Sequence, residues 1–415
     1  MREIPEPEEA DLYEAVRGAK DAPIINVVNK ILTKALQEQA SDIHVEPGSE
    51  NLRIRFRKDG ILSEAIAPLP RNIATAVVAR LKVIAALDIA ERRMPQDGRM
   101  SRVFQGRKVD FRVSTLPNRY GEKVVLRILD NSTMKLGLDK IILQPDILQI
   151  VQQMLLRPYG LMLVTGPTGS GKTTTLYSAL LELNNAETNI NTIEDPIEYT
   201  MTGITQVQVL NQKGLDFSRV LRALLRQDPD VILVGEMRDP ETVKTAVEAA
   251  LTGHLVLSTL HTNDAPSALA RLTEMGVEPF LVSDSLIGVV AQRLLRQVCS
   301  ACRTADTPSN EECVRFSIPT NTSIFRAAYR VNNKSKPCLK CGGVGYNGRC
   351  GVYEVMRVTV ELQKLISDRT PSEQLRKAAV ASGMRTMLDY GVELVRQGIT
   401  TLEEVQRVLY LPTQE

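Results

Sequence analysis

Residues 166–173 read GPTGSGKT and match the spacing G-x-x-x-x-G-K-[ST], in which each fixed position has a chemical task. The three glycines let successive backbone amides curve toward a phosphate group. Lys172 brings a positive charge to the outer phosphates, and the Thr173 hydroxyl is a ligand for Mg²⁺. The segment therefore predicts a P-loop that holds ATP with Mg²⁺. Its predicted nucleotide contacts are Gly166, Pro167, Thr168, Gly169, Ser170, Gly171, Lys172, Thr173 and Thr174.

Acidic residues follow two further apolar segments, and hydrolysis of a bound nucleotide needs such residues. Glu236 ends the segment VILVGE and is predicted to orient the attacking water or to hold Mg²⁺ through a water. The segment IEDPIEY contains Glu194, Asp195 and Glu198, of which Glu194 and Glu198 are candidate catalytic residues. The alternatives are a surface salt bridge for Glu236 and a solvated acidic turn for IEDPIEY.

Two of the three histidines bracket one apolar segment, TGHLVLSTLHTND. An extended strand places His254 and His261 at opposite ends and on opposite faces, so both cannot contact one phosphate. His261 follows the carboxyl end of this strand, where ligands of parallel sheets bind, and is the favoured phosphate sensor. His254 is kept as a candidate nucleotide contact, with a hydrogen-bonded structural histidine as its alternative.

Four of the six cysteines form two CxxC pairs, Cys299 with Cys302 and Cys338 with Cys341. Each pair supplies half of a tetrahedral thiolate site, and the second pair runs into CGGVGY, whose glycines allow a tight turn. We therefore expect a structural Zn²⁺ site, with unmetallated cysteines as the alternative. The other two cysteines have no paired spacing and are interpreted as ordinary thiols.

The surrounding pattern predicts an α/β protein. Helical spacing of apolar residues predicts helices over 24–40, 71–90 and 141–155, and period-two alternation predicts strands within 51–66, 107–116 and 121–129. Beyond residue 160, short apolar segments alternate with helical ones, which indicates a parallel sheet covered by helices. Short helices are expected from about residue 361 onward.

Composition limits the function classes. The chain has 51 Lys and Arg against 49 Asp and Glu, so no global field attracts nucleic acid or an anionic membrane. No apolar run of about 18 residues and no secretory signal is present, so a cytoplasmic location is expected. The main alternative from another class is a nucleic-acid translocase with a zinc ribbon, and against it aromatic residues are 4% and Trp is absent, so few rings are available to stack on bases. A third alternative is a nucleotide-gated scaffold without hydrolysis.

With these elements in order, the chain resembles the secretion ATPase superfamily, in the branch of type IV pilus assembly and type II secretion ATPases. The resemblance covers most of the chain: beyond the P-loop it includes IEDPIEY, LRALLRQDPDVILVGEMRD, TGHLVLSTLHTNDA and AQRLLRQVC. Upstream segments ASDIHVEP, RFRKDG, MPQDGR and FRVSTLPNRYGEKVVLRIL match the second N-terminal domain of that branch. Members often carry a further N-terminal domain, for which this sequence shows no match.

The resemblance implies the domain plan. We expect an acidic linker over 1–20, a smaller α+β, PAS-like domain over 21–135 and a C-terminal ATPase domain over 136–415. Within the latter, the resemblance implies a RecA-like core with a parallel sheet over 136–298, a tetracysteine zinc module over 299–350 and a helical region over 351–415. It also implies a homohexamer in which nucleotide is bound between the two domains.

The resemblance assigns roles to four arginines. Arg112 and Arg127 match arginines that reach over the phosphates, where guanidinium charge stabilises phosphoryl transfer. Arg222 and Arg226 are four apart, are expected on one helix face and match a second set near the interface. For each of these arginines the alternative is a surface salt bridge.

The resemblance also implies a function. We expect a hexameric ATP-hydrolysing motor that powers type IV pilus assembly at the cytoplasmic side of the inner membrane, acting on a membrane platform protein and not on nucleic acid. The tetracysteine insertion and the C-terminal helices favour pilus extension over retraction. The alternative is a type II secretion ATPase that drives pseudopilus assembly, since both share every motif named above.

Overall fold

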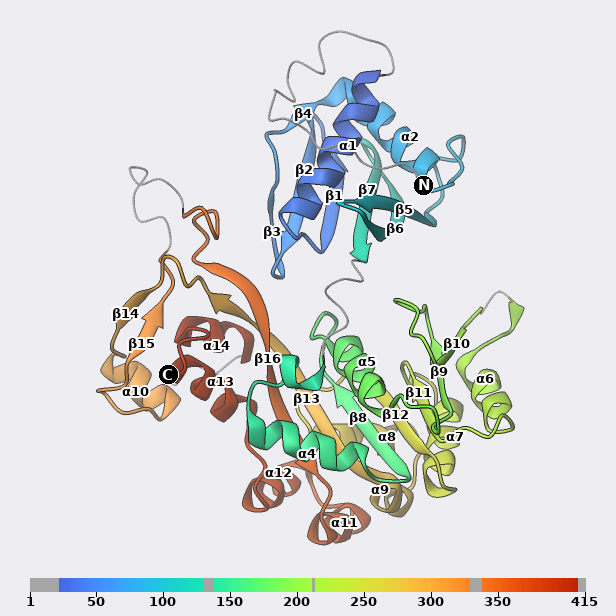
Figure 1. Ribbon diagram of the computed structural model, residues 1–415, viewed down its shortest axis with the longest axis vertical. Coiled ribbons are helices and arrows are strands. Elements are labelled where there is room, and N and C mark those ends of the chain that lie inside the picture. The colour runs from blue at the N-terminus through green and yellow to red at the C-terminus, as the bar shows by residue number, and fades with distance from the viewer. Residues whose placement is uncertain (1–21, 130–136, 211–212, 329–337, 410–415) are drawn as a thin grey trace. The chain divides into compact units, whose positions relative to one another are not determined.

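The computed structural model describes residues 22–129, 137–210, 213–328 and 338–409 (Figure 1). The chain divides into two compact units, Met1–Met134 and Lys135–Glu415. The linker expected over 1–20 lies outside the described residues. Within the described part of the chain, no helix is both long and apolar enough to cross a lipid bilayer.

The smaller unit is a mixed α/β body whose sheet has the strand order β3-β2-β1-β7-β6-β5, with β4 paired to β2. All its neighbouring strands are antiparallel. Two helices and a short 3₁₀ turn complete it, and apolar residues of the two helices share one core with the sheet. The elements are α1 Ala22–Gln37, β1 Asp42–Pro47, β2 Asn51–Lys58, β3 Ile61–Glu64, β4 Leu69–Pro70, η1 Arg71–Ile73, α2 Ala74–Ile84, β5 Gln96–Phe104, β6 Arg107–Asn118 and β7 Gly121–Leu129.

The predicted strands of this unit are confirmed, and both predicted helices end early. The helix expected over 24–40 ends at Gln37, since Gln39 has a φ of 55° that an α-helix cannot contain. The helix expected over 71–90 ends at Ile84, shortly before Ala86 at a φ of 56°. Asp59 and Gly60, both with positive φ, form the two-residue turn between β2 and β3.

The larger unit is built on a sheet with the strand order β10-β9-β11-β12-β8-β13-β16. Its strands are parallel except β16, which is antiparallel to β13. A separate antiparallel pair, β14 with β15, lies in the cysteine-containing region. The strands are β8 Gly160–Thr165, β9 Ile190–Glu194, β10 Thr205–Gln208, β11 Val231–Val234, β12 Leu255–Leu260, β13 Leu286–Val298, β14 Thr304–Asp306, β15 Ile324–Arg326 and β16 Tyr346–Arg357.

Helices cover this sheet, with α4 and α5 on the face toward the viewer in Figure 1. The predicted helix over 141–155 is confirmed in its main part as α4, which begins at Pro145, a residue that fits the first helical position. The helices are α3 Leu138–Ile141, α4 Pro145–Leu155, α5 Lys172–Leu183, α6 Phe217–Leu224, α7 Pro240–Leu251, α8 Ser267–Glu274, α9 Pro279–Ser285, α10 Asn310–Phe316, α11 Val360–Ser367, α12 Ser372–Ala381, α13 Met387–Arg396 and α14 Leu402–Leu409.

The start of the expected helical region, 351–415, needs a correction. Residues 351–357 form the second half of β16, which pairs with β13 from Gly288 to Val298. Residues 350–356 are all buried, because α4 and α13 pack against β16 and β13 pairs along it. A run buried on both faces lacks the alternation that marks a strand in sequence. Helices begin only at Val360, close to the predicted residue 361.

Candidate nucleotide-binding site and metal centre

The P-loop connects the carboxyl end of β8 to the first turn of α5. Gly166 has a φ of 151°, and a Cβ there would lie 2.5 Å from the Gln292 carbonyl oxygen and 2.6 Å from Ser170 Oγ. Gly171, at a φ of 91°, is the N-cap of α5 and leaves the first amides of the helix without a side-chain cap. These free N–H groups and the helix dipole form a cradle that fits a phosphate. Magnesium fits beside it, since Thr173, whose hydroxyl is a suitable ligand, is an exposed residue in the first turn of this helix.

Gln292 on β13 forms hydrogen bonds with the P-loop and with α5, and these contacts were not predicted from the sequence. Its side-chain amide donates to the Ser170 carbonyl at 2.8 Å and accepts from the Thr175 hydroxyl at 2.8 Å. The side chain is 1% exposed, so both bonds lie away from water. Gln292 thereby joins the loop, the first turn of α5 and β13 into one rigid piece. Its only signal in sequence was its place in the AQRLLRQVC segment.

Three of the predicted site residues follow the carboxyl ends of neighbouring parallel strands: Lys172 comes after β8, Glu236 after β11 and His261 after β12. Lys172 Nζ donates to the carbonyls of Gly166 at 2.8 Å and Pro167 at 3.1 Å, so it lies folded over the loop. Burial lowers the pKa of Lys172, and the nearby Glu236 carboxylate opposes this shift. Burial and the Lys172 charge lower the pKa of His261, with Glu236 again opposing. The three side chains therefore interact electrostatically, as a phosphate site requires.

An ion pair and a hydrogen bond also hold the segments that follow β11 and β12. Arg238 Nε lies 2.7 Å from Glu236 Oε2, although the arginine is mostly exposed and this pair is loosely held. The backbone N–H of Thr262, next to His261, donates to Thr165 Oγ1 at 2.9 Å. Thr165 is the last residue of β8, so the segment carrying His261 is tied to the strand that carries the P-loop.

Glu194 is buried, and its carboxylate is fully engaged by neighbours. It accepts from the Tyr177 hydroxyl, from Thr192 Oγ1 at 2.6 Å and from Gln206 Nε2 at 3.1 Å. This network joins α5, β9 and β10. Glu198 is half-buried and lies four residues beyond Glu194, the last residue of β9. The structure therefore places Glu194 at the predicted end of β9, where its hydrogen bond from Tyr177 holds α5 against the strand. Of the two glutamates, Glu198 is the more accessible to solvent.

The structure places His254 away from the P-loop of the same chain, so it is not among the residues that gather at that loop. It precedes β12 at the amino end of the sheet, and its carbonyl accepts from the N–H of Gly160, the first residue of β8. The P-loop begins at the opposite end of β8, about 20 Å away at the rise of a strand. His254 Nδ1 instead lies 3.0 Å from the Ala249 carbonyl, at the end of α7. This contact supports the alternative interpretation of His254 as a hydrogen-bonded structural histidine.

Arg222 and Arg226 also need a correction, because they do not share a helix face. Helix α6 ends at Leu224, and Arg226 lies beyond it and donates to the Arg222 carbonyl at 2.6 Å. The helix cannot continue, since Asp228 has a positive φ and a proline follows it. Arg222 forms an ion pair with Glu241 on α7.

Arg112 and Arg127 lie on the sheet of the smaller unit, directly opposite each other on β6 and β7. The same row continues on both sides, and directly opposite residues point to the same face. In cross-strand order the row is Arg57, Asp42, Arg127, Arg112 and Arg99. Asp42 is the single acidic member, and its carboxylate lies 3.0 Å from Arg127 Nε. Arg57 and Arg99 are members that sequence reasoning missed, because pairing across strands is invisible in sequence.

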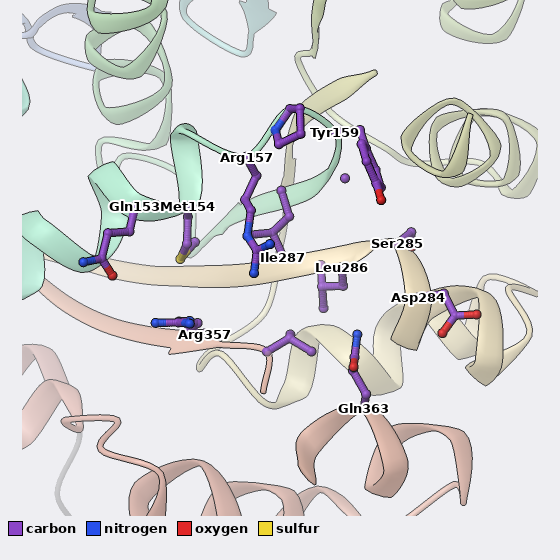
Figure 2. A pocket seen from close by; sticks show the side chains of 13 residues that line it. Gln153, Met154, Arg157, Tyr159, Asp284, Ser285, Leu286, Ile287, Arg357 and Gln363 are labelled. Carbon is purple, nitrogen blue, oxygen red and sulfur yellow. The ribbon is translucent and has the colours of Figure 1, made fainter. Parts of the chain in front are cut away.

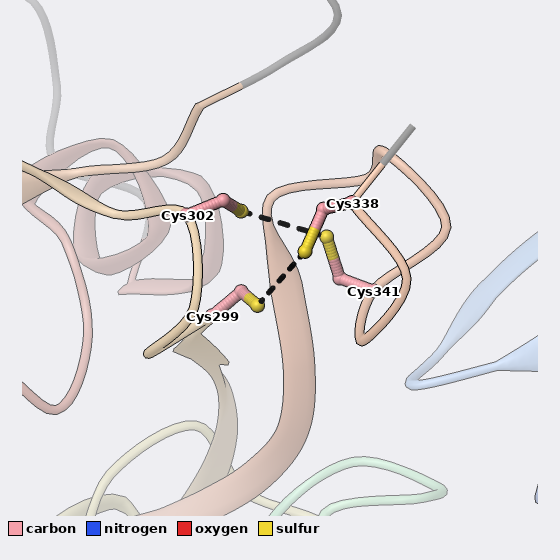
Figure 3. Close-up of side chains that lie close together, drawn as sticks. All are labelled: Cys299, Cys302, Cys338 and Cys341. Carbon is pink, nitrogen blue, oxygen red and sulfur yellow. Dashed lines mark hydrogen bonds between the residues drawn. The ribbon is translucent and has the colours of Figure 1, made fainter. Parts of the chain in front are cut away.

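The four predicted cysteine ligands converge from two loops, one after β13 and one before β16 (Figure 3). Their sulfur atoms all lie within 4.8 Å of one another. The Cys299 and Cys338 sulfurs are 3.9 Å apart, and those of Cys302 and Cys341 are 3.6 Å apart. A tetrahedral Zn²⁺ with bonds of about 2.3 Å needs sulfur separations of about 3.8 Å, so the donor set fits zinc. All six cysteines of the chain are free of disulfides.

A buried ion pair anchors this centre to the main sheet. Arg296, three residues before Cys299, pairs with Glu404 on α14 at 2.7 Å, and the two side chains are 10% and 0% exposed. Arg407 brings a second guanidinium group to Glu404, at 2.6 Å. The Arg296 guanidinium group also stacks on the Tyr346 ring. A buried carboxylate with two guanidinium partners is compensated, so the cysteine loops have a rigid base.

Comparison with known proteins agrees with this geometry. Residues 17–407 match the family described as type II/IV secretion system protein. The chain is 46% identical over 406 residues to a type IV pilus assembly ATPase, PilB, of Myxococcus xanthus, with 97% of this chain and 71% of that protein covered. It is 48% identical over 402 residues to the type II secretion system ATPase E of Vibrio cholerae, covering 97% of this chain and 78% of that protein.

Solved structures show the same fold. The ADP-bound pilus retraction motor PilT superposes with a TM-score of 0.62 at 28% identity, over 91% of this chain and 95% of that chain. The DotB ATPase of Yersinia pseudotuberculosis superposes with a TM-score of 0.68 at 18% identity, over 95% of each chain, which supports the fold alone. The family match over nearly the whole chain and the high-identity relatives place this chain in the type II/IV secretion system protein family, as an ATPase.

Proposed function

We propose that the chain hydrolyses Mg²⁺-ATP at its P-loop to drive assembly of a type IV pilus. The observation that carries the catalytic part is the gathering of Lys172, Glu236 and His261 at the edge where β8, β11 and β12 end. Bound Mg²⁺ supplies charge neutralisation at the phosphates. In this proposal Thr173 holds the metal, and Lys172 leaves its loop carbonyls to bind the outer phosphates.

The remaining residues at this edge receive the following roles. Glu236 orients the attacking water and accepts its proton, since its carboxylate is 17% exposed and interacts with Lys172. Glu198 assists from the neighbouring strand end, while Glu194 keeps α5 in place through Tyr177. His261 donates to the terminal phosphate and reports whether it is present.

We further propose that Arg112 and Arg127 bring guanidinium charge to the phosphates in an assembled homohexamer. The two arginines lie directly opposite each other and Asp42 pairs with Arg127, so this row of four arginines and one aspartate keeps a net positive charge that attracts a phosphate. A finger arginine of this kind contributes about 10³ to 10⁵ in rate. The RecA-like and PAS-like descriptions of the two units belong to the same proposal, and the order of strands β9, β11, β12 and β8 supports the first.

The proposed ring works at the cytoplasmic side of the inner membrane on a platform protein. The similarity to a pilus assembly ATPase and the tetracysteine centre support the proposal of a pilus assembly motor. The second candidate is a type II secretion ATPase, favoured by relatives of that name at 47% and 48% identity. We also propose that Zn²⁺ occupies the four-cysteine centre as a structural ion, with no open coordination position for catalysis.

The test is complementation combined with kinetics. Plasmids encoding the wild-type chain and Glu236→Gln are placed in a strain lacking its pilus assembly ATPase and in a strain lacking its type II secretion ATPase. Restored piliation by the wild type alone supports pilus assembly, and restored secretion alone supports the second candidate. Mg²⁺-dependent ATPase turnover of purified Glu236→Gln near the wild-type value would contradict the catalytic assignment.

A further inference from the structure

A cavity lies at the end of the main sheet where strand β8 begins, away from the P-loop. It has a volume of about 430 Å³ and is formed by the end of α4, the start of β8, the α9–β13 junction and the end of β16 (Figure 2). Its lining includes Gly160, the first residue of β8, whereas the P-loop follows Thr165, the last. Five residues of strand separate the two sites by about 16 Å. The cavity is therefore distinct from the ATP site.

Two arginines enter this cavity from different elements. Arg157 follows α4, and Arg357 is the last residue of β16. Both are exposed, and among the described residues neither makes an ion pair or a side-chain hydrogen bond. Most other arginines of the larger unit are paired, as Arg296 is with Glu404. Two unpaired guanidinium groups in one concave site form a receptor for a phosphate or carboxylate group.

The opposite side of the cavity has a different character. Tyr159 is 56% exposed, and Asp284 is an exposed residue on α9. In Figure 2, Tyr159 and Asp284 lie on the far side of the cavity from Arg357. Leu286 and Ile287 supply an apolar floor between the two ends. The cavity is thus polarised, with cations at one end and a ring plus an acceptor at the other.

This polarity selects a class of ligand. A nucleoside monophosphate has a dianionic phosphate for the arginines, a planar base that can stack on a tyrosine ring, and N–H donors for a carboxylate. Its size suits a cavity in the range used for small-molecule sites. An acidic peptide matches only the arginine end, because its carboxylates are repelled by Asp284.

We propose that this cavity is a second ligand site, which binds a nucleoside phosphate independently of the P-loop. Arg157 and Arg357 hold the phosphate, Tyr159 stacks on the base, and Asp284 accepts hydrogen bonds from its amino or imino groups. Because β8 runs from this cavity to the P-loop, a ligand here contacts the strand that carries the ATP site.

The test uses calorimetric titration of the full chain with AMP, GMP and inorganic phosphate as separate probes. The variants are Arg157→Gln with Arg357→Gln, Tyr159→Ala, and Lys172→Ala, which disables the P-loop. The matched control is Arg53→Gln with Arg396→Gln, since these arginines are similarly exposed and the same charge is removed. Basal ATPase turnover of the cavity variants confirms that they fold.

We expect saturable binding of AMP or GMP that survives Lys172→Ala and the control, and weakens at least about tenfold in the double cavity variant. Tyr159→Ala should weaken the nucleotides but not inorganic phosphate. The proposal is overturned if neither nucleotide binds below about 10 mM, if binding disappears with Lys172→Ala, or if the double variant binds as the wild type does. Arginine-dependent binding of a glutamate-rich peptide without nucleotide binding would overturn it in favour of a peptide site.

Discussion

Arg112 and Arg127 are directly opposite residues on β6 and β7, so their side chains leave the same face of the sheet of the smaller unit. Asp42 is paired with Arg127 on the next strand and is the only acidic member of this row. Such a row keeps excess positive charge on one face, which an anion can neutralise. The arrangement gives the first prediction.

Arg112→Ala should lower kcat for ATP hydrolysis by about 10³-fold, and Arg127→Ala by a similar factor, because each removes charge from the transition state. The affinity for ATP should change far less. Arg53→Ala is the matched control, since Arg53 lies on the same sheet but pairs with Glu64 at an exposed position. Steady-state kinetics at a fixed oligomer concentration provides the measurement, and unchanged kcat in both variants would remove these arginines from the site.

Gln292→Ala should weaken ATP binding, since it removes two buried hydrogen bonds that hold the loop and α5. The loss of about 1 to 3 kcal/mol expected for buried unpaired partners corresponds to a KM increase of about 5- to 150-fold. Gln297→Ala is the control, because Gln297 lies on the same strand and its exposed side-chain amide donates to the Arg349 carbonyl, away from the P-loop. Equal KM values for the two variants would show that Gln292 does not position the loop.

Cys338→Ser should reduce bound zinc from about one ion per chain to a small fraction, since a tetrahedral site needs all four thiolates. Cys313→Ser should retain the metal, because its sulfur lies 3.9 Å from the Pro308 carbonyl and outside the four-sulfur cluster. Elemental analysis of both variants and thermal unfolding with and without a chelator provide the measurements. Full zinc in Cys338→Ser would contradict the assignment.

His44 predicts a pH dependence of stability. Burial lowers its pKa, with Lys123 and Arg57 acting in the same direction and Glu46 and Asp42 against it. The unfolded chain therefore binds more protons than the folded one just below the usual histidine pKa of about 6.5. Stability should fall as the pH decreases through this window and the folded pKa. His44→Gln should reduce the fall in melting temperature between pH 7.5 and 5.5.

The matched variant for this experiment is His254→Gln, because His254 lies in the other unit and its ring bonds the Ala249 carbonyl. Melting curves of the wild type and both variants, recorded at the same salt concentration, separate the two histidines. An identical pH dependence for His44→Gln and the wild type would show that His44 does not contribute.

The sequence by itself determined the features whose chemistry is local. The P-loop, the CxxC pairs and the apolar strands before Glu236 and His261 depend on residues within a few positions of one another. Their backbone geometry follows from glycine conformation and strand alternation, so short-range rules suffice. The same rules failed at β16, which is buried on both faces, and at α6, where a turn ends the helix before Arg226.

Only the tertiary structure decided which distant side chains meet. Gln292 reaches the P-loop, and Tyr177 binds Glu194, because β13 and α5 pack beside the strands concerned. His254 is separated from the site since the strand direction puts it at the wrong edge of the sheet. The row containing Arg112 and Arg127 depends on the register of antiparallel strands. Register and packing are set by the burial of the whole core, which no local segment encodes.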